Sequence, residues 1–233
     1  MKREIISIIK TPVYLLNTIV GMFMMPLILF MMLKTAGENL ELINNFYLDN
    51  RLVFLSVIII GQVGLNLGTS ASTSFSREGK SFWLQRTLPI KTEDQIKSRI
   101  LSSFIVQWIG MIAMLITIIY FSKMSIIDIL IVTISGAILL IPSIQINLLV
   151  DVSNPKLDWT SPQQAMKQNT NVIISMGFNF IYLAAISIIT YILYSIIKSE
   201  LIFLILSILG LVFIKMFNKP LSNSINETIL DLE

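Results

Sequence analysis

The sequence predicts an all-α membrane protein with six transmembrane helices, because of its composition, its mean hydropathy and the spacing of its charges. Hydrophobic residues make up 55% of the 233 residues and charged residues 13%, whereas about 25% of an ordinary soluble domain is charged. The mean hydropathy is +0.79. A hydrocarbon core of ~30 Å requires about 20 apolar residues per helix, and uncharged runs of that kind recur along the chain.

The first residues predict a short helix at the membrane surface. Residues 1–10 mix charged and apolar side chains, and Thr11 and Pro12 separate them from the first long apolar run. A helix of this kind lies in the plane of the interface. A cleaved signal peptide is the alternative interpretation, but the run that follows is long and lacks a small-residue cleavage site.

Six apolar runs follow, and each predicts one span. They cover residues 13–33, 52–72, 100–121, 126–148, 172–197 and 201–217. Pro26 and Pro142 lie inside the first and fourth runs and predict kinks that neighbouring helices accommodate. Residues 34–51 are expected to form a polar loop, and a polar tail is expected after residue 217.

Two polar segments, 73–98 and 151–171, each contain a helix start signal. Thr92 and Gln95 have the spacing of a capping box, with acidic residues in the first turn, and so predict a helix that leads into span 3. Thr160 and Gln163 repeat that spacing with Pro162 early in the helix. This second helix is predicted to run directly into span 5.

The distribution of Lys and Arg predicts the orientation. If the N-terminus is cytoplasmic, 13 of these residues lie on the cytoplasmic side and 4 outside, together the 17 in the chain. Cytoplasmic loops carry an excess of Lys and Arg. The sequence therefore predicts a multi-pass protein of the cell membrane with both termini, segment 73–98 and segment 151–171 in the cytoplasm.

The composition excludes most catalytic chemistry. The chain has no cysteine and no histidine, which removes thiol nucleophiles, imidazole bases, disulfides and the common zinc sites. No phosphate-binding loop of the Gly-x-x-x-x-Gly-Lys-Ser/Thr type occurs, and a net charge of +3 is too small to suggest nucleic acid. We therefore expect no enzyme activity and no cofactor in this chain.

The second span contains small residues at helical spacing. Gly64 and Gly68 form a small-xxx-small pair, with Gly61 one turn earlier, and such pairs let two helix backbones approach closely. Ordinary helix packing is the favoured interpretation, and the lining of a substrate path is the alternative.

The spans hold neutral polar groups and no charge at their centres. Ionisable residues inside a membrane usually serve ion coupling, so their absence argues against a self-powered pump. The neutral groups either bond neighbouring helices at ~0.6 kcal/mol each or line a path that accepts amphiphiles. The candidates for path lining are Asn17, Gln62, Asn66, Gln107 and Asn179.

Three segments resemble permease subunits of ABC-2 type exporters from Gram-positive bacteria. They are Thr-Pro-Val-Tyr-Leu-Leu-Asn (11–17), Ser-Arg-Glu-Gly-Lys-Ser-Phe-Trp-Leu-Gln-Arg-Thr-Leu-Pro-Ile (76–90) and Asn-Pro-Lys-Leu-Asp-Trp-Thr-Ser-Pro-Gln-Gln-Ala-Met-Lys-Gln-Asn-Thr-Asn (154–171). The resemblance implies a surface helix, six spans, a cytoplasmic coupling helix between spans 2 and 3, and a separate ATPase subunit. Permeases with these motifs are often about twice this length, so we expect a short form or the C-terminal half of a longer permease.

The resemblance implies ATPase-coupling residues in both cytoplasmic segments. Trp and Arg dominate interface hot spots, and the apolar residues of 76–90 form no single helical stripe, which favours a protein partner over the lipid surface. The alternative is a basic inner-leaflet loop with Trp83 anchored in the headgroups. The implied coupling residues are Arg77, Glu78, Lys80, Phe82, Trp83 and Arg86, with Lys156, Asp158 and Trp159 as a second contact.

The function expected from the resemblance is a permease subunit of an ATP-binding-cassette exporter. It would move an amphiphilic peptide, lipid or drug outward, as a homodimer or with a second permease half, using the separate ATPase. The alternative is a non-transporting accessory or immunity membrane protein that binds a peptide or a partner channel.

Overall fold

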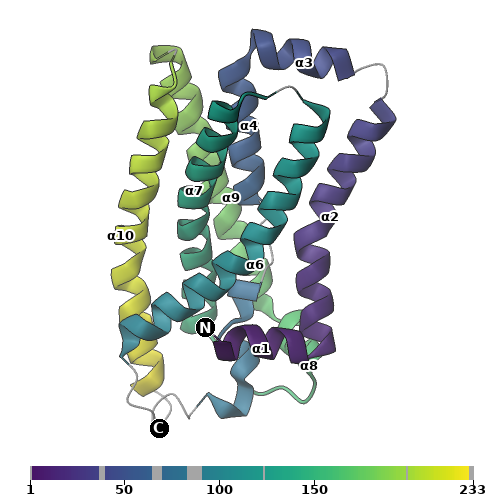
Figure 1. Ribbon diagram of the computed structural model, residues 1–233. Helices are drawn as coiled ribbons and strands as arrows, with labels where there is room; N and C mark the ends of the chain where they lie inside the picture. The colour runs from purple at the N-terminus through teal and green to yellow at the C-terminus, as the bar shows by residue number, and fades with distance from the viewer. Residues whose placement is uncertain are drawn as a thin grey trace.

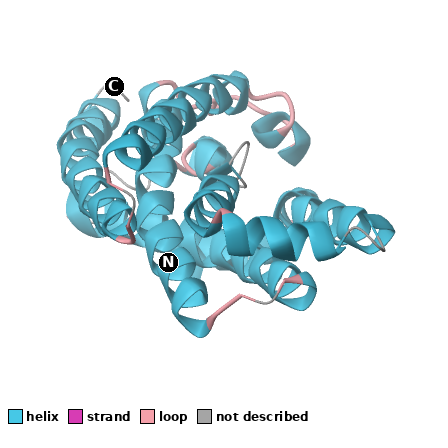
Figure 2. Ribbon diagram, turned by 90° about the horizontal axis from the view of Figure 1, so that it is seen from above, coloured by secondary structure: helices cyan, strands magenta, loops and turns pink. Residues whose placement is uncertain are grey.

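A computed structural model describes residues 2–36, 40–64, 70–82, 91–122, 124–197 and 199–230. Every regular element in this part of the chain is helical (Figure 2). Both termini lie at the same end of the helical bundle (Figure 1). We call this end the base, and it also carries the short helices α1 and α8.

The helices follow one another with short connections. Their bounds are α1 (Lys2–Lys10), α2 (Pro12–Ala36), α3 (Leu40–Asp49), α4 (Arg51–Gly64), η2 (Ser70–Thr73), η3 (Ser76–Ser81), α6 (Thr92–Phe121), α7 (Ile126–Ser153), α8 (Pro162–Met166), α9 (Thr170–Ile196) and α10 (Leu201–Leu230). The two η elements are short 3₁₀ helices.

Five described helices are long and apolar enough to cross a membrane, namely α2, α6, α7, α9 and α10. Helices α3 and α4 together are also long and apolar enough to cross a membrane, although the angle between them is 112°. The chain is therefore an all-α membrane protein with five spanning helices, or six if the bent pair is one span.

Helix α7 lies at the centre of the bundle, in contact with α4, α6, α9 and α10 (Figure 1). Its Val132, Leu139 and Ile144 are almost completely buried. Helix α2 lies at the side and turns most of its apolar side chains outward. In a bilayer this surface faces lipid, so a soluble core is not required.

The end opposite the base is held by an ion-pair cluster. Arg51 at the start of α4 contacts Asp128 of α7 and Glu200, which precedes α10. Tyr47 of α3 donates a hydrogen bond to the same Asp128 carboxylate, which is fully buried. The predicted polar loop over 34–51 is wrong at this point, because apolar residues at helical spacing form α3 and bury Tyr47.

Two further predictions about element length are wrong. The second span does not continue as one α-helix to residue 72, because Ser70–Thr73 form a 3₁₀ helix. The tail after residue 217 is helical to Leu230. Its Leu221 and Ile225, one turn apart, are fully buried against α6 and α7, and this packing extends the helix.

The predicted helix starts are confirmed at Thr92 and Pro162, but their caps differ. Lys91 is the N-cap of α6 without a side-chain bond, and the Thr92 hydroxyl donates to Asn226 Oδ1 at 2.6 Å instead. Helix α8 ends at Met166 and does not continue into α9, because Asn169 caps α9 by accepting from the Asn171 amide at 3.0 Å.

Helices α2 and α6 approach closely at Gly110. A Cβ on Gly110 would lie 2.7 Å from the backbone oxygen of Met22 and 3.2 Å from its Cα. We expect Gly110→Ala to push α2 away from α6 and to lower the free energy of unfolding by about 1–3 kcal/mol. Gly21→Ala is the matched control, because a Cβ there meets nothing within 4 Å. Thermal unfolding in detergent that is equal for both variants would contradict this account of the contact.

Candidate functional site

The predicted coupling segment begins inside the base of the bundle. We call residues 70–82, which include η2 and η3, the base segment. From Ser70 to Arg77 each of its residues is buried, although most are polar. Buried polar groups require hydrogen-bond partners, and the base segment finds them on α1, α6 and α7 and on the loop before α8.

Asp151, two residues before the end of α7, anchors the base segment. Its carboxylate is fully buried and accepts hydrogen bonds from the backbone amides of Phe75 at 2.6 Å and Ser76 at 3.1 Å. It also accepts from the Ser76 hydroxyl and, at 3.1 Å, from Asn171 Nδ2 of α9. One carboxylate thus joins the base segment to α7 and α9.

Trp159 closes over the base segment from the other cytoplasmic segment predicted from the sequence. Its indole N–H donates to the Ser76 carbonyl at 2.8 Å. Gly79 has φ of +51°, and a Cβ there would lie 2.8 Å from the Trp159 ring. Only glycine combines this left-handed backbone with so close a ring, so residues 76–81 are two 3₁₀ turns broken at Gly79 and not one helix.

A second buried cluster joins the base segment to α1 and α6. We call Glu4, Arg77, Glu78 and Arg99 the base charge cluster. Arg99 contacts Glu4 at 3.0 Å and also Glu78, and Arg77 contacts Glu4 at 3.3 Å. The two arginine side chains are 3% and 4% exposed. Two positive and two negative charges meet here, so the buried cluster is neutral as a whole.

Aromatic rings cover the base charge cluster. The Arg99 guanidinium lies 3.8 Å from the centroid of the Phe75 ring, a distance typical of a cation–π contact. Phe75 in turn meets Phe82 edge to face, with centroids 6.1 Å apart. The guanidinium also donates to the Ser74 carbonyl at 2.9 Å and to its hydroxyl at 2.7 Å. Arg99 therefore fixes the middle of the base segment on the first turns of α6.

The base charge cluster sets the ionisation of Glu4. Burial by itself raises the pKa of this carboxyl, but the neighbouring Arg99 and Arg77 guanidiniums outweigh burial and hold the pKa below its ordinary value of 4.5. Glu4 therefore contributes stability that is fully present above pH 4.5 and is lost as the pH falls through its lower folded-state pKa.

We expect acidification below pH 4.5 to loosen α1 from the base. Thermal unfolding in detergent, followed between pH 7 and pH 3, should show a steeper loss of stability in the wild type than in Glu4→Gln. The variant should also be less stable at pH 7, because both guanidiniums lose a charged partner. Equal pH slopes for the two proteins would show that Glu4 does not titrate as described.

The predicted coupling residues divide into buried and exposed groups. Arg77 and Phe82 are buried, and Glu78 is paired with Arg99. These side chains therefore bind the base segment to the rest of the bundle. Lys80 is exposed, and Trp83 and Arg86 lie outside the described residues. Of the six residues predicted for the first contact, Lys80 is the one whose side chain is exposed within the described residues.

The second predicted contact divides in a similar way. The Lys156 ammonium donates to the Gln168 carbonyl at 2.8 Å, and Trp159 packs on Gly79 as described above. Asp158 is exposed. Segments 76–82 and 154–171 are thus brought together at the base through the contacts of Trp159 with Ser76 and Gly79.

Asn179 and Asn17 bond within the bundle. Asn179 is buried and bonds to Ser143 and Asn147 of α7, which is the interhelical bonding considered as the alternative to path lining. Asn17 donates to the Val13 carbonyl of its own helix at 2.8 Å. Asn66 and Gly68 lie outside the described residues.

Gln62 and Gln107 are buried glutamines in the spans. The Gln62 amide lies against Gly136 of α7, where a Cβ would overlap its oxygen. Gly61 would meet only the terminal methyl of Met114, at 3.1 Å, and Gly64 only a methyl of Leu183, at 3.9 Å. Neither glycine brings two backbones of this chain together, and Gly110 does so instead.

Sequence reasoning missed Glu4, Arg99 and Asp151 as site residues. In the sequence Glu4 lies in the mixed segment 1–10, Arg99 is one basic residue before span 3, and Asp151 opens segment 151–171. One signal was available for Asp151. A carboxylate that directly follows a long apolar run must either accept hydrogen bonds within the protein or lie in water, because burying it without partners is costly. The partners themselves are 95 residues apart for Glu4 and Arg99.

Residues 16–219 match the profile of a protein family described as membrane protein of 12 TMs. The match covers α3, α4, α6, α7, α8 and α9, most of α2 and α10, and the base segment. No curated protein and no solved structure matches the chain.

Proposed function

The chain belongs to the family of membrane proteins of 12 TMs, and from this premise we propose that it is the permease subunit of an ATP-binding-cassette exporter. In this proposal it moves an amphiphilic peptide, lipid or drug outward. A separate ATPase subunit hydrolyses the nucleotide, and the chain acts as a homodimer or with a second permease half.

The observation that carries the proposal is the double attachment of the base segment. Asp151 ties it to α7 and α9, and Arg99 ties it to α6 and α1. A force applied to the base segment is therefore passed to three long apolar helices through buried bonds. Packed helices move between discrete arrangements rather than deforming continuously. In this proposal a shift of the base segment therefore moves these helices as rigid elements.

The exposed chemistry of the base supports a protein partner there. Lys80 and Asp158 are exposed next to the buried anchors, and the resemblance to ABC-2 permeases lies in these same two segments. We propose that the base faces the cytoplasm, where the excess of Lys and Arg is expected, and where an ATPase has its nucleotide.

The test is association with an ATPase encoded beside this gene. The tagged chain and that ATPase are co-expressed, purified together and reconstituted in proteoliposomes. We expect co-purification and substrate-dependent ATP hydrolysis, both reduced at least tenfold in a Lys80→Glu, Trp83→Ala, Arg86→Ala variant. Lys10→Glu is the control, because Lys10 is exposed on α1 at the base but lies outside both polar segments.

Two outcomes would count against the proposal. Association that is undiminished in the triple variant would remove the coupling role from this segment. A chain that binds no ATPase at all would favour the alternative, a non-transporting accessory or immunity membrane protein.

A further inference from the structure

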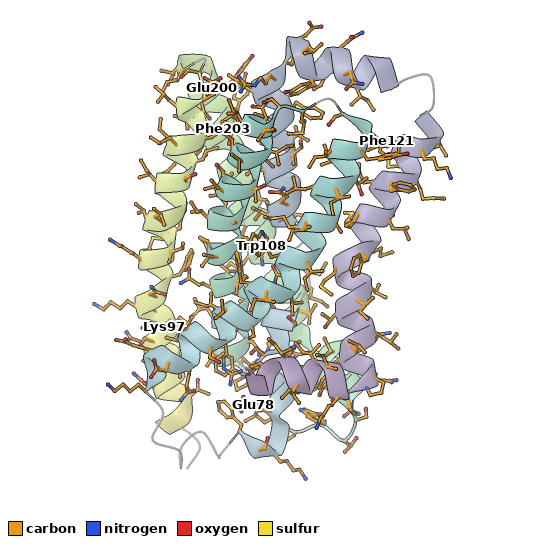
Figure 3. All side chains as sticks on the ribbon, viewed as in Figure 1. Glu78, Lys97, Trp108, Phe121, Glu200 and Phe203 are labelled. Atoms are coloured by element: carbon orange, nitrogen blue, oxygen red, sulfur yellow. The ribbon has the colours of Figure 1, made fainter. Side chains whose placement is uncertain are left out.

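A groove of about 640 Å³ lies on the side of the bundle near the base, between the first turns of α6 and the second half of α10. Ile141 of α7 also lines it. Figure 3 labels Lys97 at this place, on the part of α6 that reaches α10. The groove is separate from the base charge cluster and from the Asp151 anchor, whose residues do not line it.

Helical spacing gives each wall of the groove an apolar part and a basic part. The wall from α6 carries side chains at intervals of three and four residues, which lie on one helix face. The same holds for α10. The α6 residues are Glu93, Ile96, Lys97 and Ile100, and the α10 residues include Ile214, Lys215, Asn218, Lys219 and Ser222.

The lysines lie at the depth of a lipid headgroup. Lys215 and Lys219 follow the first residue of α10, Leu201, by 14 and 18 residues, which is about 21 and 27 Å along an α-helix. The hydrocarbon core is ~30 Å thick. Lys219 therefore lies near the membrane–water boundary on the side of the base, and Lys215 reaches that boundary with its flexible stem. Ile100 and Ile214 lie farther from the base than Lys97 and Lys215.

We propose that this groove binds one anionic phospholipid. Its phosphate lies among Lys97, Lys215 and Lys219, and an acyl chain lies along the isoleucines of the groove. Three lysines face one carboxylate, that of Glu93, so the groove has an excess of two positive charges. That excess complements an anionic headgroup, and the apolar part suits an acyl chain and not a soluble anion.

Two hydrogen bonds shape the polar end of the site. Asn218 Oδ1 accepts from Gln145 Nε2 at 2.7 Å, which leaves the Asn218 amide N–H groups to donate to a phosphate oxygen. The Thr92 hydroxyl bonds Asn226 at 2.6 Å and joins the start of α6 to α10 below the groove.

The experiment measures phospholipid binding to the purified chain in detergent by native mass spectrometry. Phosphatidylglycerol and phosphatidylcholine with identical acyl chains are titrated separately. The wild type should bind one phosphatidylglycerol at least tenfold more tightly than phosphatidylcholine. Each lysine near an anionic surface accounts for about a fivefold change in affinity, so Lys97→Gln, Lys215→Gln, Lys219→Gln together should weaken binding on the order of 100-fold.

A matched triple variant, Lys10→Gln, Lys34→Gln, Lys167→Gln, removes the same charge at exposed positions outside the groove and should bind like the wild type. Glu93→Gln should bind about fivefold more tightly, a gain that misfolding does not produce. Equal affinity of the wild type and the groove variant would overturn the proposal. So would equal binding of the two lipids, or displacement of phosphatidylglycerol by millimolar glycerol phosphate, which would indicate a soluble anion.

Discussion

Asp151→Ala should release the base segment and lower the free energy of unfolding by about 3–5 kcal/mol. The change leaves the buried amides of Phe75 and Ser76 without the acceptor that they share, and each buried donor left unpaired costs about 1–3 kcal/mol. For a chain of this size the melting temperature should fall by roughly 10 °C. Circular dichroism in detergent measures that shift, and hydrogen exchange should show the largest gain within residues 70–82.

Two further variants sharpen this result. Asp151→Asn keeps one carbonyl for the backbone amides, but its NH₂ group then faces the Asn171 amide, which is also a donor, so we expect about half of the loss. Asp158→Ala removes an exposed carboxylate seven residues away and should change stability by less than about 0.5 kcal/mol. If Asp151→Ala behaved like Asp158→Ala, the carboxylate would not be the anchor of the base segment.

Arg99→Met should detach α1 from the bundle at a similar cost, about 3–5 kcal/mol, because the carboxylates of Glu4 and Glu78 lose a buried partner. Met keeps an unbranched apolar stem but is shorter than Arg, and it lacks the charge and the donors of the guanidinium. Limited proteolysis within residues 2–10 should become faster, together with a lower melting temperature.

Charge removal on the other side tests whether the base charge cluster acts as a unit. Adding Glu78→Gln to Arg99→Met should recover part of the stability, since Arg77 and Glu4 then remain as a neutral pair and no uncompensated carboxylate is left among them. Lys97→Met, on the same helix, removes an exposed ammonium 3.7 Å from Glu93 and should cost about 0–1 kcal/mol. Additive losses in the combined variant would contradict a coupled cluster.

The positions of the spanning helices could be predicted well because the signal is local. A run of about 20 apolar residues must form its backbone hydrogen bonds within itself in lipid, and such runs predicted α2, α6, α7, α9 and α10 in place. Helix ends were less predictable. The chain from residue 218 onward is polar in composition, yet Leu221 and Ile225 make it helical by packing on α6 and α7.

The site itself could be predicted only in part. Segments 76–90 and 154–171 were identified from their composition and resemblance, and Trp159 on Gly79 brings their described parts together. The direction of each side chain was not predictable, because exposure depends on neighbours from other helices. Arg77 has the composition of a surface charge in the sequence, but it is buried in the structure, where its guanidinium donates to the carboxylate of Glu4, 73 residues earlier.

The sequence by itself determined that this is a helical membrane protein, where its apolar helices run, and which polar segments lie between them. These properties follow from the length and polarity of continuous stretches. Only the tertiary structure decided that Asp151 meets Ser76 from 75 residues away, that Arg99 meets Glu4, and that three lysines of α6 and α10 share one groove. Such contacts depend on which helix ends come together in space, and that is set by packing between helices rather than by any local pattern.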